Sequence, residues 1–249
     1  MLLKRIKRIF ISTLVIAAIV GSCFSTYANN KDSTYKKEDI ILGLDAGHNI
    51  NESSYKKDYN GIGEVEYNYE IVHRIKENIE RIRPDVKVYL TNSDKMNRGR
   101  SSRAEECKQN NVDFIISIHQ DALGHDMQTS VNGTHAIVDQ DSMENVTTYL
   151  ANRIIKDYSS NTGIPLRNNG VDNQRNNIGL LDKATDLGIP GILIECGFYD
   201  NPEYNNLINS EEGLNMVSNS ISDGIIRHVI TYLDKLHQNK PNEQNGFRK

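Results

Sequence analysis

Apolar residues follow one another without polar alternation in three short stretches, residues 40–45, 114–119 and 189–197. Each run is too short for a helix, and unbroken runs of this length are typical of strands buried on both faces of a parallel sheet. Three weaker segments are also predicted as strands: residues 86–90, 134–138 and 178–181. Residues 161–177 are polar and are predicted to form a long loop that lines a cleft.

Between the strands, apolar residues return every three or four positions, which is the spacing of an amphipathic helix. Residues 65–83 are the clearest case, with isoleucines at 71, 75, 79 and 82 and a stop at Pro84. Further helices are predicted over residues 143–160 and 207–236, with a short polar one before residue 111. Strands that alternate with helices indicate one three-layer α/β domain with a mostly parallel central sheet flanked by helices, which we assign to residues 40–236.

The N-terminus, residues 1–28, is predicted to be a signal peptide or an N-terminal membrane anchor. Four cations among the first eight residues precede an apolar segment, Ile9–Val20, and Thr26-Tyr27-Ala28 resembles a small-residue cleavage site. The apolar segment is short for a membrane span, which needs about twenty residues. A third interpretation is a lipoprotein-like box ending at Cys23. All three place the domain outside the cytoplasmic membrane, after a polar linker at 29–39; residues 237–249 form a polar tail.

Charge and cysteine content exclude some classes of function. The net charge of the 249 residues is −4, and loss of the four N-terminal cations would make it −8. An acidic domain lacks the positive field that nucleic-acid binding needs, so we predict no nucleic-acid partner and membrane contact only through the N-terminal segment. Cys107 on a predicted helix and Cys196 in a predicted strand are expected to be two buried thiols, not a disulfide.

Two of the predicted buried strands lead into a histidine. His48 follows the first through a tight Ala-Gly turn, and His119 ends the strand at 114–119. Neighbouring parallel strands would bring both imidazoles to one edge of the sheet, where open α/β sheets place their ligands. Each histidine alone is more often structural. The pair, joined by a carboxylate, would predict a metal site.

Glu64, just before the helix at 65–83, is the best third ligand. Catalytic zinc commonly takes three protein ligands, and two histidines with one glutamate form a known set. A carboxylate at this position also stabilises the helix dipole without any metal. Spacing alone leaves both interpretations open, with Glu66 and Glu70 as rival ligands.

Glu195 is a carboxylate within the apolar run of residues 192–198. Burying it would cost on the order of several kcal/mol unless it is paired or protonated. Active sites use such a carboxylate as a general base. The alternative is a buried ion pair with an arginine or lysine.

Four motifs occur in order along the chain. They are Asp45-Ala46-Gly47-His48, Glu64-x-x-x-Asn68, Ser117-Ile118-His119-Gln120-Asp121-Ala122 and Pro190-Gly191-Ile192-Leu193-Ile194-Glu195-Cys196-Gly197-Phe198-x-x-Asn201. Together they resemble the zinc-dependent N-acetylmuramoyl-L-alanine amidases of the Amidase_3 type over roughly residues 40–233. Arg103 and Asp113 also match an arginine and an aspartate of the family. Asp-Ala-Gly-His-Asn replaces the usual Asp-Pro-Gly-His-Gly and Cys107-Lys108 an Ala-Asn pair, which bears on substrate fit more than on metal binding.

The resemblance implies that His48, Glu64 and His119 bind Zn²⁺ and that Glu195 is the catalytic glutamate. It favours Glu64 over Glu66, because the family's glutamate lies four residues before the helix asparagine. The implied reaction is hydrolysis of the amide between N-acetylmuramic acid and L-alanine in peptidoglycan. Asp45 would either support the metal ligands from behind or cap the turn at the strand end.

The short chain, the export signal and the lack of wall-binding repeats are similar to the germination-specific amidases. Those enzymes act on spore cortex, where peptide removal precedes muramic-δ-lactam formation. The implied location is the cell wall or the spore intermembrane space, reached through the N-terminal segment or an accessory protein. Two alternatives stay open: a zinc-dependent cell-wall peptidase or carboxypeptidase, and a non-catalytic wall-binding protein on the same fold.

Overall fold

The computed structural model describes residues 39–49, 62–92, 98–123, 129–139, 146–172 and 179–239. The predicted signal or anchor at 1–28, nearly all of the linker and most of the C-terminal tail lie outside these residues. No helix in the described part of the chain is long and apolar enough to cross a membrane.

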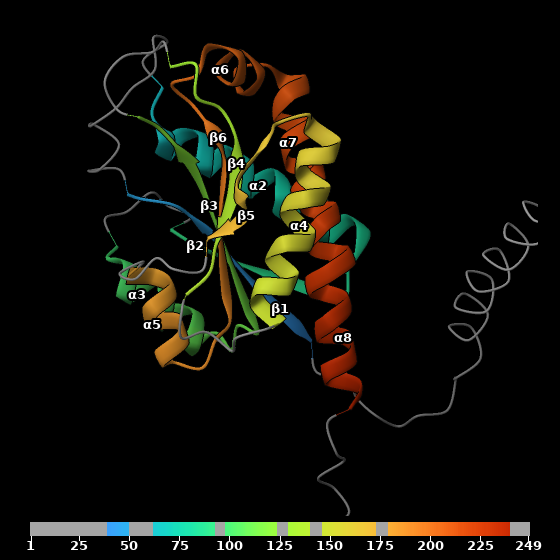
Figure 1. The fold of residues 1–249 in the computed structure, drawn as a ribbon. Coiled ribbons are helices and arrows are strands. Elements are labelled where there is room, and N and C mark those ends of the chain that lie inside the picture. The colour runs from blue at the N-terminus through green and yellow to red at the C-terminus, as the bar shows by residue number, and fades with distance from the viewer. Residues whose placement is uncertain are drawn as a thin grey trace, which may run out of the picture. The chain divides into compact units, whose positions relative to one another are not determined.

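Six strands form one sheet in the order β2-β1-β3-β6-β4-β5 (Figure 1). Their bounds are β1 (Ile40–Ala46), β2 (Val86–Thr91), β3 (Phe114–Asp121), β4 (Thr134–Ile137), β5 (Leu166–Asp172) and β6 (Gly191–Phe198). Neighbouring strands are parallel except β4 and β6, which are antiparallel. The prediction of a mostly parallel central sheet is confirmed. Because β1, β3 and β6 are adjacent and parallel, the carboxyl ends of the three apolar runs meet at one edge.

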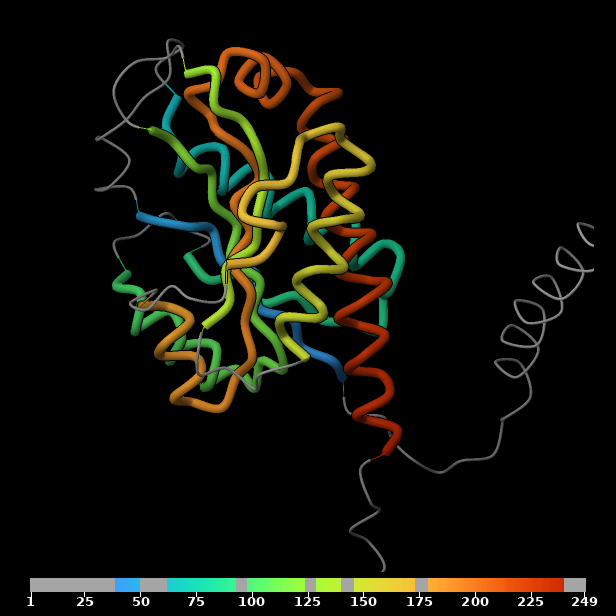
Figure 2. The backbone as a smooth tube through the Cα atoms, in the orientation of Figure 1, coloured from blue at the N-terminus to red at the C-terminus, as the bar shows by residue number. Residues whose placement is uncertain are grey.

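Helices cover both faces of the sheet. One face carries α2 (Glu64–Ile82), α4 (Val146–Thr162) and α7 (Glu211–Gly224), and the other carries α3 (Arg100–Gln109) and α5 (Gly179–Asp186), as the tube in Figure 2 shows. The short α6 (Pro202–Ile208) follows β6, and α7 continues through a π-helical turn, η2 (Ile225–Ile230), into α8 (Thr231–Gln238). This is the three-layer arrangement that the sequence predicts.

The two faces are filled differently. Under α2, α4 and α7, large aliphatic side chains such as Ile75, Ile154 and Val217 form one continuous core. Under α3 and α5 the apolar clusters are smaller and include Ala104, Cys107 and Ala184. Cys107 and Cys196 are both buried free thiols, which confirms that prediction. Burial raises the pKa of the Cys107 thiol to about 12, so it stays protonated at neutral pH.

Two predictions around residue 170 are wrong. The predicted strand at 178–181 overlaps α5, a helix that buries Leu180, Leu181 and Ala184 on one face. The predicted loop at 161–177 contains the end of α4 and the edge strand β5. An edge strand is partly solvated and can be polar. In β5, Asn168, Asn169 and Gly170 have φ values of 51°, 57° and 92°, outside the extended conformation of a strand. These residue types tolerate such angles and are typical of turns, so the sequence does not predict a strand here.

Candidate active site

The ends of β1 and β3 bring two imidazoles together. The strands pair in register, with Ala46 opposite Ile118, and the Gly47 N–H donates to the Ile118 carbonyl at 2.9 Å. The ring centroids of His48 and His119 lie 4.9 Å apart at an interplanar angle of 71°. A Cβ on Gly47 would lie only 2.4 Å from atoms of the His119 ring, so a residue without a side chain is needed between the histidines.

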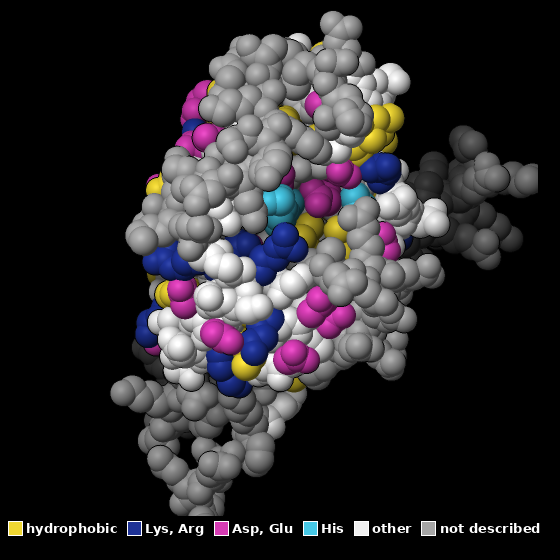
Figure 3. Space-filling view, turned by 90° about the vertical axis from the view of Figure 1, so that its left-hand side faces the viewer, with side chains coloured by type: hydrophobic (Ala, Val, Ile, Leu, Met, Phe, Trp, Pro, Cys, Tyr) yellow, Lys and Arg dark blue, Asp and Glu magenta, His cyan; other side chains and the backbone are white. Residues whose placement is uncertain are grey.

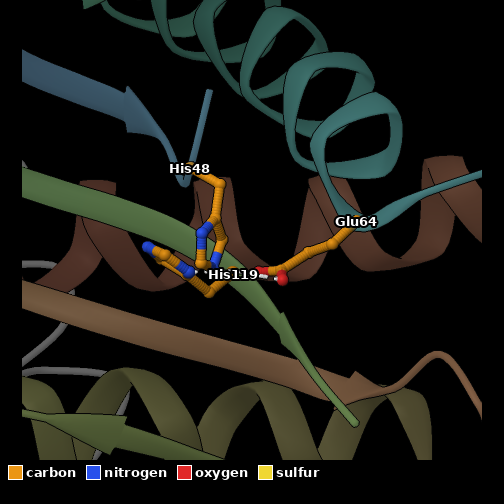
Figure 4. Close-up of side chains that lie close together, drawn as sticks. All are labelled: His48, Glu64 and His119. Atoms are coloured by element: carbon orange, nitrogen blue, oxygen red, sulfur yellow. Dashed lines mark hydrogen bonds and ion pairs between the residues drawn. The ribbon is translucent and has the colours of Figure 1, made fainter. Parts of the chain in front are cut away.

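Glu64, the first residue of α2, contacts both histidines (Figure 4). Its Oε2 lies 3.2 Å from His48 Nε2 and its Oε1 lies 3.1 Å from His119 Nδ1. The three residues can each offer one ligand atom such that all lie within 4.8 Å of one another. The rival glutamates have other contacts: Glu66 Oε2 accepts from the Gly63 N–H at 3.1 Å, and Glu70 pairs with Arg74.

Hydrogen bonds from buried amides fix the Glu64 carboxylate. Its Oε1 accepts from the Gln120 N–H at 3.0 Å and from Asn68 Nδ2 at 3.2 Å. Asn68 in turn accepts from Gln120 Nε2 at 3.2 Å, and Tyr204 donates to Gln120 Oε1 at 2.6 Å. The roles of Gln120 and Tyr204 are not predicted by the sequence pattern. In the sequence, Gln120 is marked only as part of the motif at residues 117–122, and Tyr204 carries no signal.

The charges of this cluster support one another. Burial disfavours the charged form of Glu64, but the hydrogen bond and charge of His119 and the charge of His48 outweigh it and lower the pKa of Glu64. Burial likewise opposes protonation of His119, but the hydrogen bond and charge of Glu64 raise its pKa. Glu64 is therefore a carboxylate at neutral pH, as a metal ligand must be.

The donor set of two imidazoles and one carboxylate is one that zinc accepts. Zinc bonds to histidine nitrogen and carboxylate oxygen at about 2.0–2.2 Å, so tetrahedral ligand atoms are roughly 3.3 Å apart. The three ligand atoms lie within 4.8 Å of one another, which is close enough for one ion to contact all three. Two imidazoles and one carboxylate leave room for a fourth, non-protein ligand.

Asp45 is the acceptor of a buried ion pair beneath the histidines. Arg103 Nη1 donates to Asp45 Oδ1 at 2.6 Å, and Ser117 Oγ donates to Oδ2 at 2.6 Å. Thr91 also donates to Asp45, and Arg103 Nη1 reaches the Ala46 carbonyl at 3.1 Å. Asp45 therefore ties β1, β2, β3 and α3 together below the cluster.

Glu195 lies in β6 directly opposite His119 of β3 and opposite His135 of β4. The charge of Glu195 contributes to the raised pKa of His119. A cavity of about 170 Å³ is lined by Asp45, His48, Arg100, Arg103, His119, Ile137, Leu180, Leu193 and Glu195. Figure 3 shows histidine and acidic side chains in a hollow, with basic side chains along its border. The structure thus places Glu195 and both histidines around one cavity, with Glu64 behind the histidines.

The sequence comparison identifies the class of protein that this fold and site define. The family Amidase_3, described as N-acetylmuramoyl-L-alanine amidase, matches residues 42–227. The chain belongs to this family of peptidoglycan amidases. No protein in the search of curated sequences gives a significant match.

Several solved amidases have the same fold. The catalytic domain of CwlV from Bacillus (Paenibacillus) polymyxa var. colistinus is 24% identical with a TM-score of 0.65, over 78% of this chain and 98% of that one. An amidase from Clostridium difficile 630 is 22% identical with a TM-score of 0.67, over 82% and 99%. The CwlD amidase from Clostridioides difficile, solved in complex with the GerS lipoprotein, is 23% identical with a TM-score of 0.63, over 78% and 100%.

Proposed function

We propose that this chain is a zinc-dependent amidase that hydrolyses the bond between N-acetylmuramic acid and L-alanine in peptidoglycan. His48, Glu64 and His119 would hold the metal, and Glu195 would be the general base. The observation that carries the proposal is the cluster of three ligand atoms, two of them from histidines that line a cavity together with Glu195, in a member of an amidase family.

Bound zinc would polarise the lactyl carbonyl of the substrate and lower the pKa of a water molecule toward about 7. Glu195 takes a proton from the attacking water as the water oxygen bonds to the lactyl carbon. The Glu195 carboxyl then gives this proton to the L-alanine nitrogen as the carbon–nitrogen bond breaks. The products are the free carboxyl group of muramic acid and a peptide with a free L-alanine amine.

Digestion of purified peptidoglycan by the metal-free and the zinc-loaded protein tests this function. Mass spectrometry should find peptide-free glycan strands and peptides beginning with free L-alanine, only when zinc is present. Cleavage within the stem peptide would instead support the peptidase alternative. Tight binding to peptidoglycan without cleavage would support a wall-binding protein.

The finer proposal is that the substrate is spore cortex and that the protein acts in germination. The support is the export-signal composition of residues 1–28, a feature in which the chain resembles the germination-specific amidases. Cortex from spores that lack the protein should then contain no muramic-δ-lactam. Normal lactam content would contradict this role but leave the amidase activity standing.

We also propose export across the cytoplasmic membrane, with an accessory protein for localisation or activation. Residues 1–28 have the composition of an export signal or anchor. The CwlD structure of similar fold is described as a complex with a lipoprotein, which makes a comparable partner a reasonable proposal here. Affinity purification from the exported fraction, with and without residues 1–28, tests both points.

A further inference from the structure

One cation that lines the cavity has no counter-charge among the described residues. Arg100 lines the cavity together with His48 and Glu195. Within the described ranges no hydrogen bond or ion pair involves its guanidinium. The arginines on either side of it in the sequence are paired: Arg98 with Glu106 at 3.0 Å, and Arg103 with Asp45 at 2.6 Å.

The position of Arg100 is electrostatically unfavourable for the helix that it begins. Helix N-termini favour acidic residues, yet the first turn of α3 contains none, and its N-cap is Gly99, which has no side chain to accept from the free N–H groups. Arg103, which is 3% exposed and lines the same cavity, has a buried Nε without a hydrogen-bond acceptor among the described residues. Two arginine side chains that line the cavity, Arg100 and Arg103, therefore have donor groups without an acceptor among the described residues.

The stem of Arg100 is also held in place. A Cβ added to Gly179, at the start of α5, would lie 3.2 Å from Arg100 Cδ, so the arginine packs against the bare backbone of the facing helix. A positioned guanidinium that has no partner in the described part of the chain is suited to an external anion. The planar guanidinium group can donate two parallel N–H hydrogen bonds to one carboxylate.

We propose that Arg100 binds a free carboxylate on the peptide side of the scissile amide, an inference that rests on the proposed function. The lactyl carboxyl of muramic acid is used up in the scissile amide, and its remaining groups are neutral hydroxyls and an acetamide. The nearest anion is the α-carboxylate of the D-isoglutamate that follows L-alanine, about two residues or roughly 7 Å along the peptide. Arg100 therefore selects D-isoglutamate over D-isoglutamine, in which this carboxylate is an amide.

Two soluble substrates test the inference: N-acetylmuramoyl-L-alanyl-D-isoglutamate and its D-isoglutamine counterpart. They have the same scissile bond and nearly the same size and differ in one charge. With the zinc-loaded full chain, we expect kcat/KM to be about 10- to 100-fold higher for the acid, the range of a charge-assisted hydrogen bond. Arg100→Ala should lower kcat/KM for the acid to that for the amide, mainly through KM. Arg100→Lys should keep part of the preference.

Arg98→Ala is the matched control, because its guanidinium is already paired with Glu106 and it does not line the cavity. This variant should keep the full preference. Equal cleavage of both substrates by the wild type would overturn the role of Arg100 and leave the proposed function standing. An equal loss on both substrates in Arg100→Ala would also overturn it, because it would indicate a structural role. Cleavage of neither substrate by the zinc-loaded wild type would overturn the proposed function, and the inference with it.

Discussion

The start of α2 and the end of β6 each place one glutamate at the same edge of the sheet, in very different surroundings. Both carboxylate oxygens of Glu64 have partners: His119, Gln120 and Asn68 at Oε1 and His48 at Oε2. Glu195 faces a cavity whose walls also include the apolar side chains of Ile137, Leu180 and Leu193. Glu64 is therefore held by hydrogen bonds and ion pairs to polar side chains and backbone, whereas Glu195 is part of a cavity wall that contains both polar and apolar side chains.

This difference explains how two nearby glutamates can have different roles. A metal ligand must stay ionised and hold its position, and hydrogen bonds to the charged form do both. A general base must exchange protons with water and substrate, which requires access to the cavity. The surroundings of Glu64 fit the first requirement, and the position of Glu195 fits the second.

The largest effect should come from removing an imidazole beside Glu64. His48→Ala or His119→Ala leaves two protein ligands, which hold catalytic zinc poorly. Each variant should lose zinc on dialysis and lose activity by more than about 10³-fold, because the metal would no longer polarise the carbonyl or activate water. Zinc content and turnover are the measurements. His73→Ala on α2, outside the cluster, is the control and should keep its metal; full zinc content in either ligand variant would contradict the assignment.

The next effect concerns the ion pair that supports the site from below. Asp45→Asn leaves the buried Arg103 without its counter-charge, and loss of one partner of a buried pair costs about 3–5 kcal/mol of unfolding free energy. Denaturant unfolding measures it. Glu70→Gln, which breaks the exposed pair with Arg74, should cost less than about 1 kcal/mol. Similar costs for the two variants would show that the Asp45 cluster does not anchor the site.

A smaller effect should follow from removing one of the hydrogen bonds that hold the Glu64 carboxylate. Asn68→Ala removes the donor to Glu64 Oε1 and a bond to the Gly47 carbonyl. Residues that orient metal ligands typically change metal affinity by about 10- to 100-fold. Competition with a zinc chelator measures the affinity. Asn78→Ala on the same helix, where the side chain bonds Asn219 at the surface, should leave the affinity as it is. Equal zinc affinity in both variants would contradict the claim that Asn68 orients Glu64 as a metal ligand.

The smallest effect separates Glu64 from its neighbour. Glu66→Ala removes the carboxylate that accepts from the Gly63 N–H, so we expect a loss of about 0.5–2 kcal/mol in stability, as for other helix caps, with zinc retained. Thermal unfolding and metal analysis of the same sample check both points. Loss of zinc in this variant would mean that the wrong carboxylate was assigned as ligand.

The parts of the fold and site that depend on local pattern could be predicted from the sequence. The three apolar runs are β1, β3 and β6, and their parallel pairing brings His48, His119 and Glu195 to one edge. Glu64 could not be separated from Glu66 by spacing alone, because the choice depends on which carboxylate caps the helix and which faces β3.

Features that depend on distant contacts could not be predicted. Gln120 and Tyr204 are 84 residues apart in the sequence, and only the packing of α6 on the sheet makes their hydrogen bond. An exposed arginine such as Arg100 is ordinary in a sequence, and only the cavity distinguishes it from Arg98. The start of α5 has the pattern of a short apolar strand, and the helical spacing appears only when Ala184 is included with Leu180 and Leu181.

The most direct test of the different roles of the two glutamates is zinc content and turnover measured together in Glu64→Gln and Glu195→Gln. Glutamine keeps the size of glutamate but is a poor zinc ligand and cannot take up the proton. We expect Glu195→Gln to hold wild-type zinc with activity lowered by about 10²- to 10⁴-fold, and Glu64→Gln to lose both. A Glu195→Gln protein that holds zinc and turns over near the wild-type rate, or a Glu64→Gln protein that keeps its zinc, would contradict the account.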